Sequence, residues 1–282
     1  MKLAIVNDRL IPQADLDPIF FDRGLYFGDG VYEVLRSYHG KIFALDEHLE
    51  RFAGSMAAIR ITGIDIGTIR ERVLRAFNAA GLVNAKIYFH VTRGSAPRNH
   101  TWAKDIKPNF FLTISELGDS SKEKANGIAV CTHPDLRWKR CDIKSLNLLG
   151  NVLATQEAKE AGAYDAILVR DGVVTEGSHT GVCAVFDGTV VTHPLTPEIL
   201  GSVTRDFVLR SCRELGAACA ERDILVASLY EADEVMLLGT TSGIMPVIEI
   251  DGRRIGVGCP GPVTRRLQAA LHSRMLGGTL RA

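Results

Sequence analysis

Apolar residues in the first third of the chain recur at the spacing of two amphipathic helices. The first set alternates steps of four and three residues: Leu45, Leu49, Phe52, Met56 and Ile59. The second set is Ile69, Val73 and Phe77, followed by Gly81. Such spacing places each set on one face of a helix, and a glycine is a common helix end. We therefore predict two helices that each bury one face.

Period-two patterns around these helices predict strands. A hairpin that turns at His39-Gly40 is predicted by VYEVLRSYHGKIFAL, and two further strands by AKIYFHVTRG and NFFLTISEL. Next comes the polar, turn-forming segment GDSSKEKANG, which favours a linker between domains. We expect a smaller N-terminal α/β domain over 1–117, a linker over 118–127 and a larger sheet-rich domain over 128–282.

The second half of the chain alternates apolar runs with turn signals. Three dipeptides each separate two apolar runs and predict tight hairpins: Asp171-Gly172, Asp187-Gly188 and Asp251-Gly252. Helices are predicted over 147–161, 202–215 and 262–275, and a buried strand over YDAILV. The predicted fold class is α+β in two parts.

Charge balance narrows the function classes. Lysine plus arginine and aspartate plus glutamate number 33 each in 282 residues, so no net field would hold a nucleic acid or an anionic membrane surface. With 46% hydrophobic and 23% charged residues, the chain has the composition of a globular protein with a core. We therefore expect small-molecule chemistry, and neither nucleic-acid nor membrane binding.

Targeting and cysteine patterns give two further expectations. The N-terminus MKLAIVNDRLIP reaches charged residues and proline too soon for a signal-peptide core, and no apolar run is long enough to span a bilayer. A cytoplasmic location is therefore expected. The six cysteines form no CxxC pair and have no histidine at zinc-ligand spacing, so we expect free thiols and no metal.

Lys144 is the first candidate for chemistry. It follows Ile143 and precedes SLNLLG, whereas most of the ten lysines lie in polar surroundings. Desolvation disfavours the charged form of an amine and frees it to attack a carbonyl group. A surface lysine at a strand end gives the same local pattern, so this residue is not decisive by itself.

Two features could hold parts of a ligand. Glu176 ends an apolar strand in VVTEGSHTG, where a carboxylate can pair with a protonated ring nitrogen or cap the next turn. The segments LGSVTRD and LLGTTSGIMP are rich in hydroxyls and backbone donors, and the first lies just ahead of a predicted helix start. Such a start attracts phosphate through its N–H groups and dipole, although ordinary capping is the alternative.

Cationic side chains complete the set of candidates. Arg51 flanks the first predicted helix, where its guanidinium could reach a phosphate or lie in solvent. The loop VTRGSAPRNH brings Arg93, Arg98 and His100 within eight residues, and two of these cations could converge on a substrate carboxylate. A solvated basic loop is the alternative. Taken together, the lysine, the glutamate, the anion-binding turns and the paired cations match the needs of a pyridoxal phosphate enzyme.

Several motifs occur along nearly the whole chain in the order of one family. They are DRGLYFGDGVYEV, IYFHVTRGSAPR, RCDIKSLNLLG, VTEGS, THP, TRD and TTSGI, of which RCDIKSLNLLG is the most specific. The chain resembles the class IV (fold type IV) pyridoxal phosphate aminotransferases, and within them those that act on D-amino acids. The resemblance implies two domains, with the active site at their junction and at a dimer interface. It also implies transamination between a D-amino acid such as D-alanine and a 2-oxo acid such as 2-oxoglutarate, through pyridoxamine phosphate.

The resemblance assigns roles to matching positions. Lys144 would form the Schiff base with pyridoxal 5'-phosphate and act as the base, and Glu176 would keep the pyridine nitrogen protonated. The other cofactor-binding positions are Arg51, Ser178, Leu200, Val203, Thr204, Thr240 and Thr241. The substrate-binding positions are Tyr32, Val34, Arg98 and His100, with Arg98 and His100 reaching across from the partner subunit of a homodimer.

The chain departs from the family pattern at one turn. Where such enzymes continue EGSSSN, this chain has EGSHTG, so His179 and Gly181 change the contacts expected around the cofactor. Arg36 stands where a lysine is common, and we assign it no role. Alternatives with the same fold are an (R)-amine transaminase, a branched-chain L-aminotransferase and an aminodeoxychorismate lyase. Alternatives of another class are a catalytically silent cofactor-binding protein and a histidine-based hydrolase, although no GxSxG arrangement is present.

Overall fold

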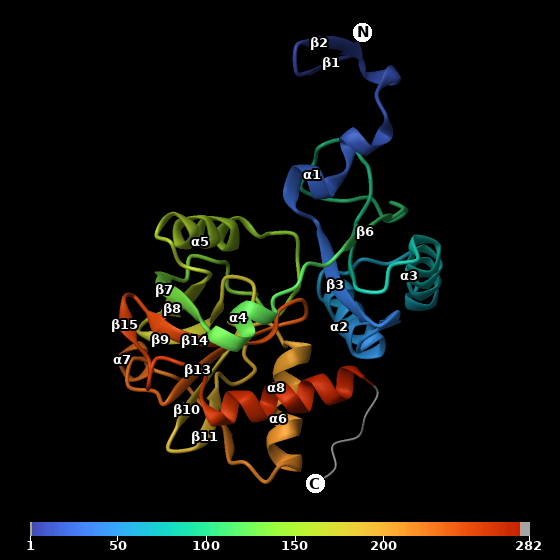
Figure 1. The fold of residues 1–282 in the computed structure, drawn as a ribbon. Helices are drawn as coiled ribbons and strands as arrows, with labels where there is room; N and C mark the ends of the chain where they lie inside the picture. The colour runs from blue at the N-terminus through green and yellow to red at the C-terminus, as the bar shows by residue number, and fades with distance from the viewer. Residues whose placement is uncertain (1, 277–282) are drawn as a thin grey trace.

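The computed structural model describes residues 2–276, which form two main sheets covered by helices (Figure 1). The smaller sheet is antiparallel, in the order β4-β3-β5-β6. Its strands are β3 (Gly30–Tyr38), β4 (Lys41–Ile42), β5 (Ala85–Thr92) and β6 (Asn109–Glu116). The hairpin predicted at His39-Gly40 is confirmed, and both of its turn residues have positive φ, 48° and 76°.

The two helices predicted in the first third are confirmed as α2 (Leu45–Ala58) and α3 (Ile66–Ala80). They pack on the smaller sheet, and the predicted apolar faces supply its core together with strand residues such as Val31 and Phe89. Gly81 ends α3 in the left-handed conformation, with φ 63°. This core fixes β3, which carries side chains into the cavity described below.

The larger sheet is mixed and has nine strands within the described residues, in the order β12-β11-β10-β13-β14-β7-β8-β9, with β15 paired to β14. The strands are β7 (Ile128–Pro134), β8 (Ala166–Arg170), β9 (Val173–Gly177), β10 (Gly181–Phe186), β11 (Thr189–Thr192), β12 (Cys219–Glu221), β13 (Glu234–Gly239), β14 (Gly243–Ile250) and β15 (Arg253–Arg254). The β7–β8, β7–β14 and β11–β12 pairs are parallel, and the other pairs are antiparallel. The sheet curls, so that β9 at one end of the strand order lies beside β10. In the turn between them the Gly177 N–H donates to the Thr180 carbonyl at 2.7 Å.

Alternate residues of the central strands build two cores. Val235 and Leu237 of β13 face the core enclosed by the curled sheet, whereas Met236 and Leu238 face helices α6 and α8. The helices on this sheet are α5 (Leu149–Glu160), α6 (Val203–Glu214), α7 (Val226–Leu229) and α8 (Pro262–Met275). The predicted helices over 202–215 and 262–275 are therefore confirmed, and α5 begins two residues later than predicted.

All three predicted Asp-Gly hairpins are confirmed. They join β8 to β9, β10 to β11 and β14 to β15. Each aspartate has φ between 49° and 52° and each glycine has φ between 74° and 79°. Two successive positive φ values define the tight turn whose twist matches that of the paired strands, and this is why an Asp-Gly dipeptide predicts a hairpin.

Shorter elements complete the description. A hairpin of β1 (Leu3–Val6) and β2 (Arg9–Pro12) stands apart at the top of Figure 1, followed by two 3-10 turns, Gln13–Asp15 and Pro18–Phe21, and by α1 (Arg23–Phe27). The segment predicted as a linker, 118–127, contains the helix α4 (Ser121–Asn126), which turn-forming residues did not signal. The domain boundaries themselves stay a prediction. The fold class α+β is confirmed, because separate sheets are covered by helices.

No helix within residues 2–276 has the length and apolar character needed to cross a membrane. The six cysteines are free thiols, and three of them, Cys141, Cys183 and Cys212, are buried.

Candidate active site

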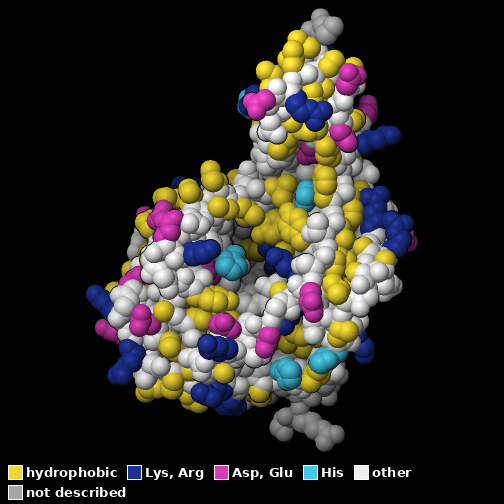
Figure 2. All heavy atoms as spheres, turned by 45° about the horizontal axis from the view of Figure 1, so that its top comes forward, with side chains coloured by type: hydrophobic (Ala, Val, Ile, Leu, Met, Phe, Trp, Pro, Cys, Tyr) yellow, Lys and Arg dark blue, Asp and Glu magenta, His cyan; other side chains and the backbone are white. Residues whose placement is uncertain are grey.

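A cavity of about 700 Å³, open solvent included, lies where the two parts of the chain meet. The smaller part contributes Tyr32 and Arg51, and the larger part contributes Lys144, Glu176 and Leu200 among others. Figure 2 shows a hollow between the larger body and the projecting smaller part, with basic and apolar side chains around it. The cavity therefore collects side chains from both parts of the chain around one space.

Lys144 lies half-buried in the loop between β7 and α5. Its backbone is attached to the smaller part, because its carbonyl accepts the Tyr32 N–H at 3.0 Å and its N–H donates to Ser55 Oγ at 3.1 Å. The Nζ atom lies 4.2 Å from the centre of the Tyr32 ring. The chain therefore holds the backbone of this lysine firmly while its amine lines the cavity.

Glu176 is buried near the end of β9, as its position at the end of an apolar run predicted. Its Oε1 accepts from Arg137 Nη1, and its Oε2 accepts the Leu200 N–H at 3.2 Å. Burial raises the pKa of Glu176, and the positive charge of Arg137 opposes this effect most strongly. Arg137 was not predicted from the sequence, although it lies three residues before the motif RCDIKSLNLLG.

Arg51 extends from α2 toward the loop before α6. Its Nε and Nη2 donate to the two oxygens of Glu33 at 3.0 and 2.7 Å, and its Nη1 donates to the Gly201 carbonyl at 3.0 Å. Burial by itself raises the pKa of Glu33, but Arg51 and then His48 outweigh it and hold that pKa well below its usual range. Glu33, which the sequence did not single out, thus orients the guanidinium.

Two backbone turns lie beside Arg51 and the cavity: one at Ser202, where α6 starts, and one at Thr240 and Thr241. Ser202 caps α6 by accepting the Arg205 N–H at 3.2 Å, and the preceding N–H groups of Val203 and Thr204 belong to the first helical turn, which has no partner within a helix. Ser202 and Thr240 line the cavity, whereas Val203, Thr204 and Thr241 are not among its lining residues. Arg36 donates to the Thr241 carbonyl and so supports the second turn, a contact that its sequence position did not reveal.

The segment EGSHTG, residues 176–181, where the chain differs from the family pattern, surrounds a buried aspartate. Asp165, with no exposed surface, accepts from the hydroxyls of Ser178 and Thr180, and the latter contact is 3.0 Å. The Nδ1 atom of His179 lies 2.9 Å from Ser178 Oγ and 3.6 Å from Asp165 Oδ1. A serine-histidine-aspartate hydrolase needs different ring nitrogens for these two contacts, so the geometry does not support the hydrolase alternative.

The basic loop divides its cations between two tasks. Arg93 is buried and pairs with Asp29 through Nε at 2.9 Å, so Arg98 and His100 are the two cations of this loop that stay available to a substrate carboxylate. Arg98 and His100 are exposed beside Phe27, and Arg23 holds the loop by donating to the carbonyls of Asn99, His100 and Thr101. Neither Arg98 nor His100 lines the cavity of its own chain, and Val34 does not line it either.

The donor set of the cavity fits pyridoxal 5'-phosphate. An amine, Lys144, faces the same space as the buried carboxylate of Glu176, which suits a ring nitrogen. Arg51 touches the loop that starts α6, so a cation and free helical N–H groups meet where a phosphate would bind. Leu200 adds an apolar wall. Fold and site together define a pyridoxal phosphate enzyme.

The chain belongs to the class IV aminotransferases, and it is a pyridoxal phosphate-dependent aminotransferase. The family model described as amino-transferase class IV matches residues 30–250. The D-alanine aminotransferase of Bacillus licheniformis is 41% identical over 279 residues, which cover 98% of each chain. The D-alanine aminotransferase of Staphylococcus haemolyticus is 38% identical, covering 96% of this chain and 97% of that one.

Solved structures show the same fold. The branched-chain amino acid aminotransferase from Escherichia coli has a TM-score of 0.83 and 27% identity, covering 97% of this chain and 94% of that one. A second branched-chain amino acid aminotransferase, solved with pyridoxamine 5'-phosphate, has a TM-score of 0.87 and 26% identity, covering 97% and 93%. The branched-chain aminotransferase from the archaeon Thermoproteus uzoniensis has a TM-score of 0.83 and 26% identity, covering 96% and 93%. The predicted fold type IV is thereby confirmed.

Proposed function

We propose that this enzyme transfers amino groups between D-amino acids, D-alanine among them, and 2-oxo acids such as 2-oxoglutarate. The observation that carries the proposal is the 41% identity to a D-alanine aminotransferase over 98% of both chains. The cavity supports it, because it brings Lys144, Glu176 and Arg51 to one space.

The side chains divide the chemical work among them. When bound, pyridoxal phosphate supplies an electron sink for negative charge at the substrate α-carbon. Lys144 Nζ would take the proton from that carbon and would return it to the cofactor carbon on the other side of the amino nitrogen, and the Tyr32 ring beside Nζ limits where the amine can reach. Glu176 keeps a proton on the ring nitrogen by accepting its hydrogen bond. The first product leaves before the second substrate binds, so the kinetics are ping-pong.

Further positions hold the cofactor without moving protons. Arg51, the N–H groups of Val203 and Thr204, and the turn at Thr240 and Thr241 bind the phosphate. Leu200 packs on the ring, and Ser178 supports the turn after Glu176 through its bond to Asp165.

We also propose a homodimer in which Arg98 and His100 of the partner subunit complete the substrate site, beside Tyr32 and Val34. Both cations are exposed and held on a braced loop, away from their own chain's cavity. Helix α5, next to the cavity, exposes Leu149, Val152 and Leu153 at 72%, 57% and 49%, an apolar face suited to a partner surface.

Mixing two impaired variants tests the dimer, at a D-alanine concentration far below the KM of Arg98→Ala, where neither variant alone turns over measurably. Lys144→Ala and Arg98→Ala homodimers each lack one component of every site, whereas a mixed dimer has one complete site. After refolding together, the mixture should recover roughly a quarter of the wild-type activity on D-alanine, as random pairing of two subunits requires. No recovery, with mixed dimers present, would place Arg98 outside a shared site.

Substrate choice is tested by the visible spectrum of the loaded enzyme. The cofactor band should change on adding D-alanine and stay unchanged with L-leucine or an (R)-amine. The structural similarity to branched-chain amino acid aminotransferases makes the L-specific enzyme the second candidate, and a response to L-leucine alone would establish it. A lyase would act on aminodeoxychorismate without any oxo-acid acceptor.

The proposed contact of Arg98 with the substrate carboxylate is tested by Arg98→Ala. The control is Lys104→Ala, which removes another exposed cation of the same loop. Loss of a charged hydrogen bond should raise the KM for D-alanine about 10- to 100-fold, and the control should not change it. An unchanged KM in Arg98→Ala would favour an amine substrate that lacks a carboxylate.

A further inference from the structure

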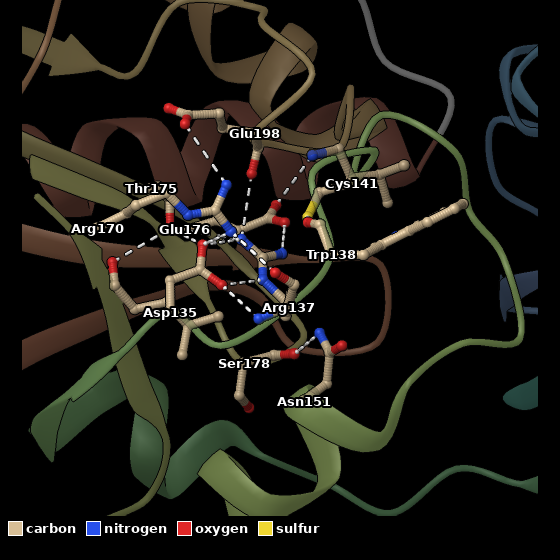
Figure 3. Close-up of polar contacts among 12 residues, drawn as sticks. Asp135, Arg137, Trp138, Cys141, Asn151, Arg170, Thr175, Glu176, Ser178 and Glu198 are labelled. Carbon is tan, nitrogen blue, oxygen red and sulfur yellow. Dashed lines mark hydrogen bonds and ion pairs between the residues drawn. The ribbon is translucent and has the colours of Figure 1, made fainter.

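Four charged side chains of alternating sign, each at most 14% exposed, lie in a row behind the cavity. Figure 3 shows Arg170, Asp135, Arg137 and Glu176 pointing toward one another. Asp135 and Arg137 lie in the loop that follows β7, Arg170 ends β8 and Glu176 belongs to β9. These are three neighbouring strands of the larger sheet. Only Glu176 and Arg137 of the four line the cavity, so the row leads away from it.

Arg137 has a separate task for each part of its guanidinium. Its Nε and Nη2 donate to the two oxygens of Asp135, both at 2.8 Å, and Nη2 also donates to the Glu198 carbonyl at 3.1 Å. Nη1 is directed to Glu176. Because the side chain is 5% exposed and doubly held by Asp135, it cannot turn away from Glu176 without breaking that two-pronged contact.

Asp135 is fixed in turn. Its side chain has no exposed surface, and its Oδ2 accepts from Thr175 Oγ1 at 2.9 Å and lies 3.0 Å from Arg170 Nη2. A second arginine balances the charge of Asp135, which leaves the charge of Arg137 available to Glu176. The packing around Arg137 is also close, since a Cβ added at Gly150 would lie 3.2 Å from its Cγ.

We propose that Arg137, held by Asp135 and Arg170, is a positioning residue that keeps the Glu176 carboxylate ionised and aimed into the cavity. A buried carboxyl group without a cation would take up a proton and lose the charge that a protonated ring nitrogen needs. The backbone N–H of Leu200 fixes the second oxygen of Glu176 at 3.2 Å. Arg137 and Leu200 together thus define the direction of the carboxylate.

The other titratable groups around Glu176 are Lys144 and Cys141. Lys144 acts on Glu176 only through its charge, and the buried Cys141 thiol, whose pKa burial raises, stays neutral. The inference rests on the proposed pairing of Glu176 with the ring nitrogen. Its test therefore includes a measurement that does not depend on turnover.

The test follows the Glu176 carboxyl group by ¹³C NMR against pH in the full-length protein, with and without pyridoxal phosphate, the signal being assigned by Glu176→Gln. In Arg137→Gln without cofactor, the titration midpoint of Glu176 should rise by about one to three pH units. Arg137→Lys should restore much of the midpoint because it keeps the charge. Arg140→Gln, which removes a half-exposed arginine three residues away that pairs with Asp142, is the matched control and should leave the midpoint unchanged.

The loaded enzyme gives the second readout. With Arg137→Gln, kcat should fall about tenfold or more near neutral pH and recover as pH rises through the new midpoint, which a merely structural defect would not do. An unmoved midpoint in a folded Arg137→Gln protein would overturn the proposal. If Arg137→Gln does not fold, Arg137→Lys provides the test, because one ammonium group cannot hold both Asp135 and Glu176. The affinity of Arg137→Lys for pyridoxamine phosphate should then fall at least about tenfold. An unchanged affinity would overturn the proposal. Full activity of Glu176→Gln would instead reject the role of Glu176 while leaving the titration result intact.

Discussion

The pair between Glu33 and Arg51 should dominate the stability of the smaller part of the molecule. Glu33 has no exposed surface and receives Arg51 at 3.0 and 2.7 Å, the Val34 N–H at 2.9 Å and His48 at 3.2 Å. In Glu33→Gln the carboxamide would turn its NH₂ group toward one of these donors and leave Arg51 without a counter-charge. Breaking a buried ion pair from one side costs about 3–5 kcal/mol, which is the expected loss in the free energy of unfolding at pH 7.

The pH dependence gives the same reasoning a second test. The pKa of Glu33 is lowered in the folded protein from an ordinary value of 4.5, so its contribution is fully present above that pH and is lost as pH falls further. The difference between wild type and Glu33→Gln should therefore be constant from about pH 5 to pH 8 and should shrink below about pH 4.5.

Urea unfolding followed by circular dichroism measures both effects. The control is Asp46→Asn, which removes the partner of Arg70 in an ion pair between α2 and α3. Asp46 is 80% exposed, so little change is expected. A loss below about 1 kcal/mol in Glu33→Gln, or one equal to that of the control, would refute the view that Glu33 holds Arg51. The affinity for pyridoxal phosphate should fall in the same variant, because Arg51 loses its fixed direction.

Three other substitutions test the core, the loop and the amine. Phe52→Ala removes a side chain with no exposed surface and should cost about 3–5 kcal/mol in urea unfolding, whereas Val83→Ala, at 55% exposure, should cost little. Gly94→Ala should lower the melting temperature and raise the KM for D-alanine, because Gly94 has φ 121° and an added Cβ would lie 2.0 Å from the Lys107 carbonyl oxygen; normal values of both would contradict this. Lys144→Ala should lose about 10²- to 10⁴-fold in turnover, and mass spectrometry after borohydride reduction should find no attached cofactor; an attached cofactor would exclude Lys144 as the attachment point.

Local patterns predicted those elements whose formation depends on neighbouring residues. The four-three spacing through Phe52 gave α2 and its buried face, and the Asp-Gly dipeptides gave three hairpins, because backbone conformation at a turn is set by the residues in it. The helix α4 within 118–127 was missed, since its composition is that of a loop and it has no apolar face of its own to mark it. Its polar residues gave no periodic signal.

The candidate site was predicted unevenly for a related reason. The resemblance pointed to Lys144, Glu176 and Arg51, and the structure brings all three to one cavity. The sequence could not show that Arg93 forms a buried ion pair with Asp29 while Arg98 stays exposed, although both lie in one loop. The two arginines differ in their surroundings and not in their local sequence.

The sequence alone thus determined the periodic elements, the tight turns and the family to which the motifs point. Only the tertiary structure decided which charges meet, as when Arg137 meets Glu176 across 39 positions and Arg51 meets Glu33 across 18. The physical reason is that a buried charge is stable only beside a partner, and the partner is chosen by how strands and helices pack, which no local pattern records.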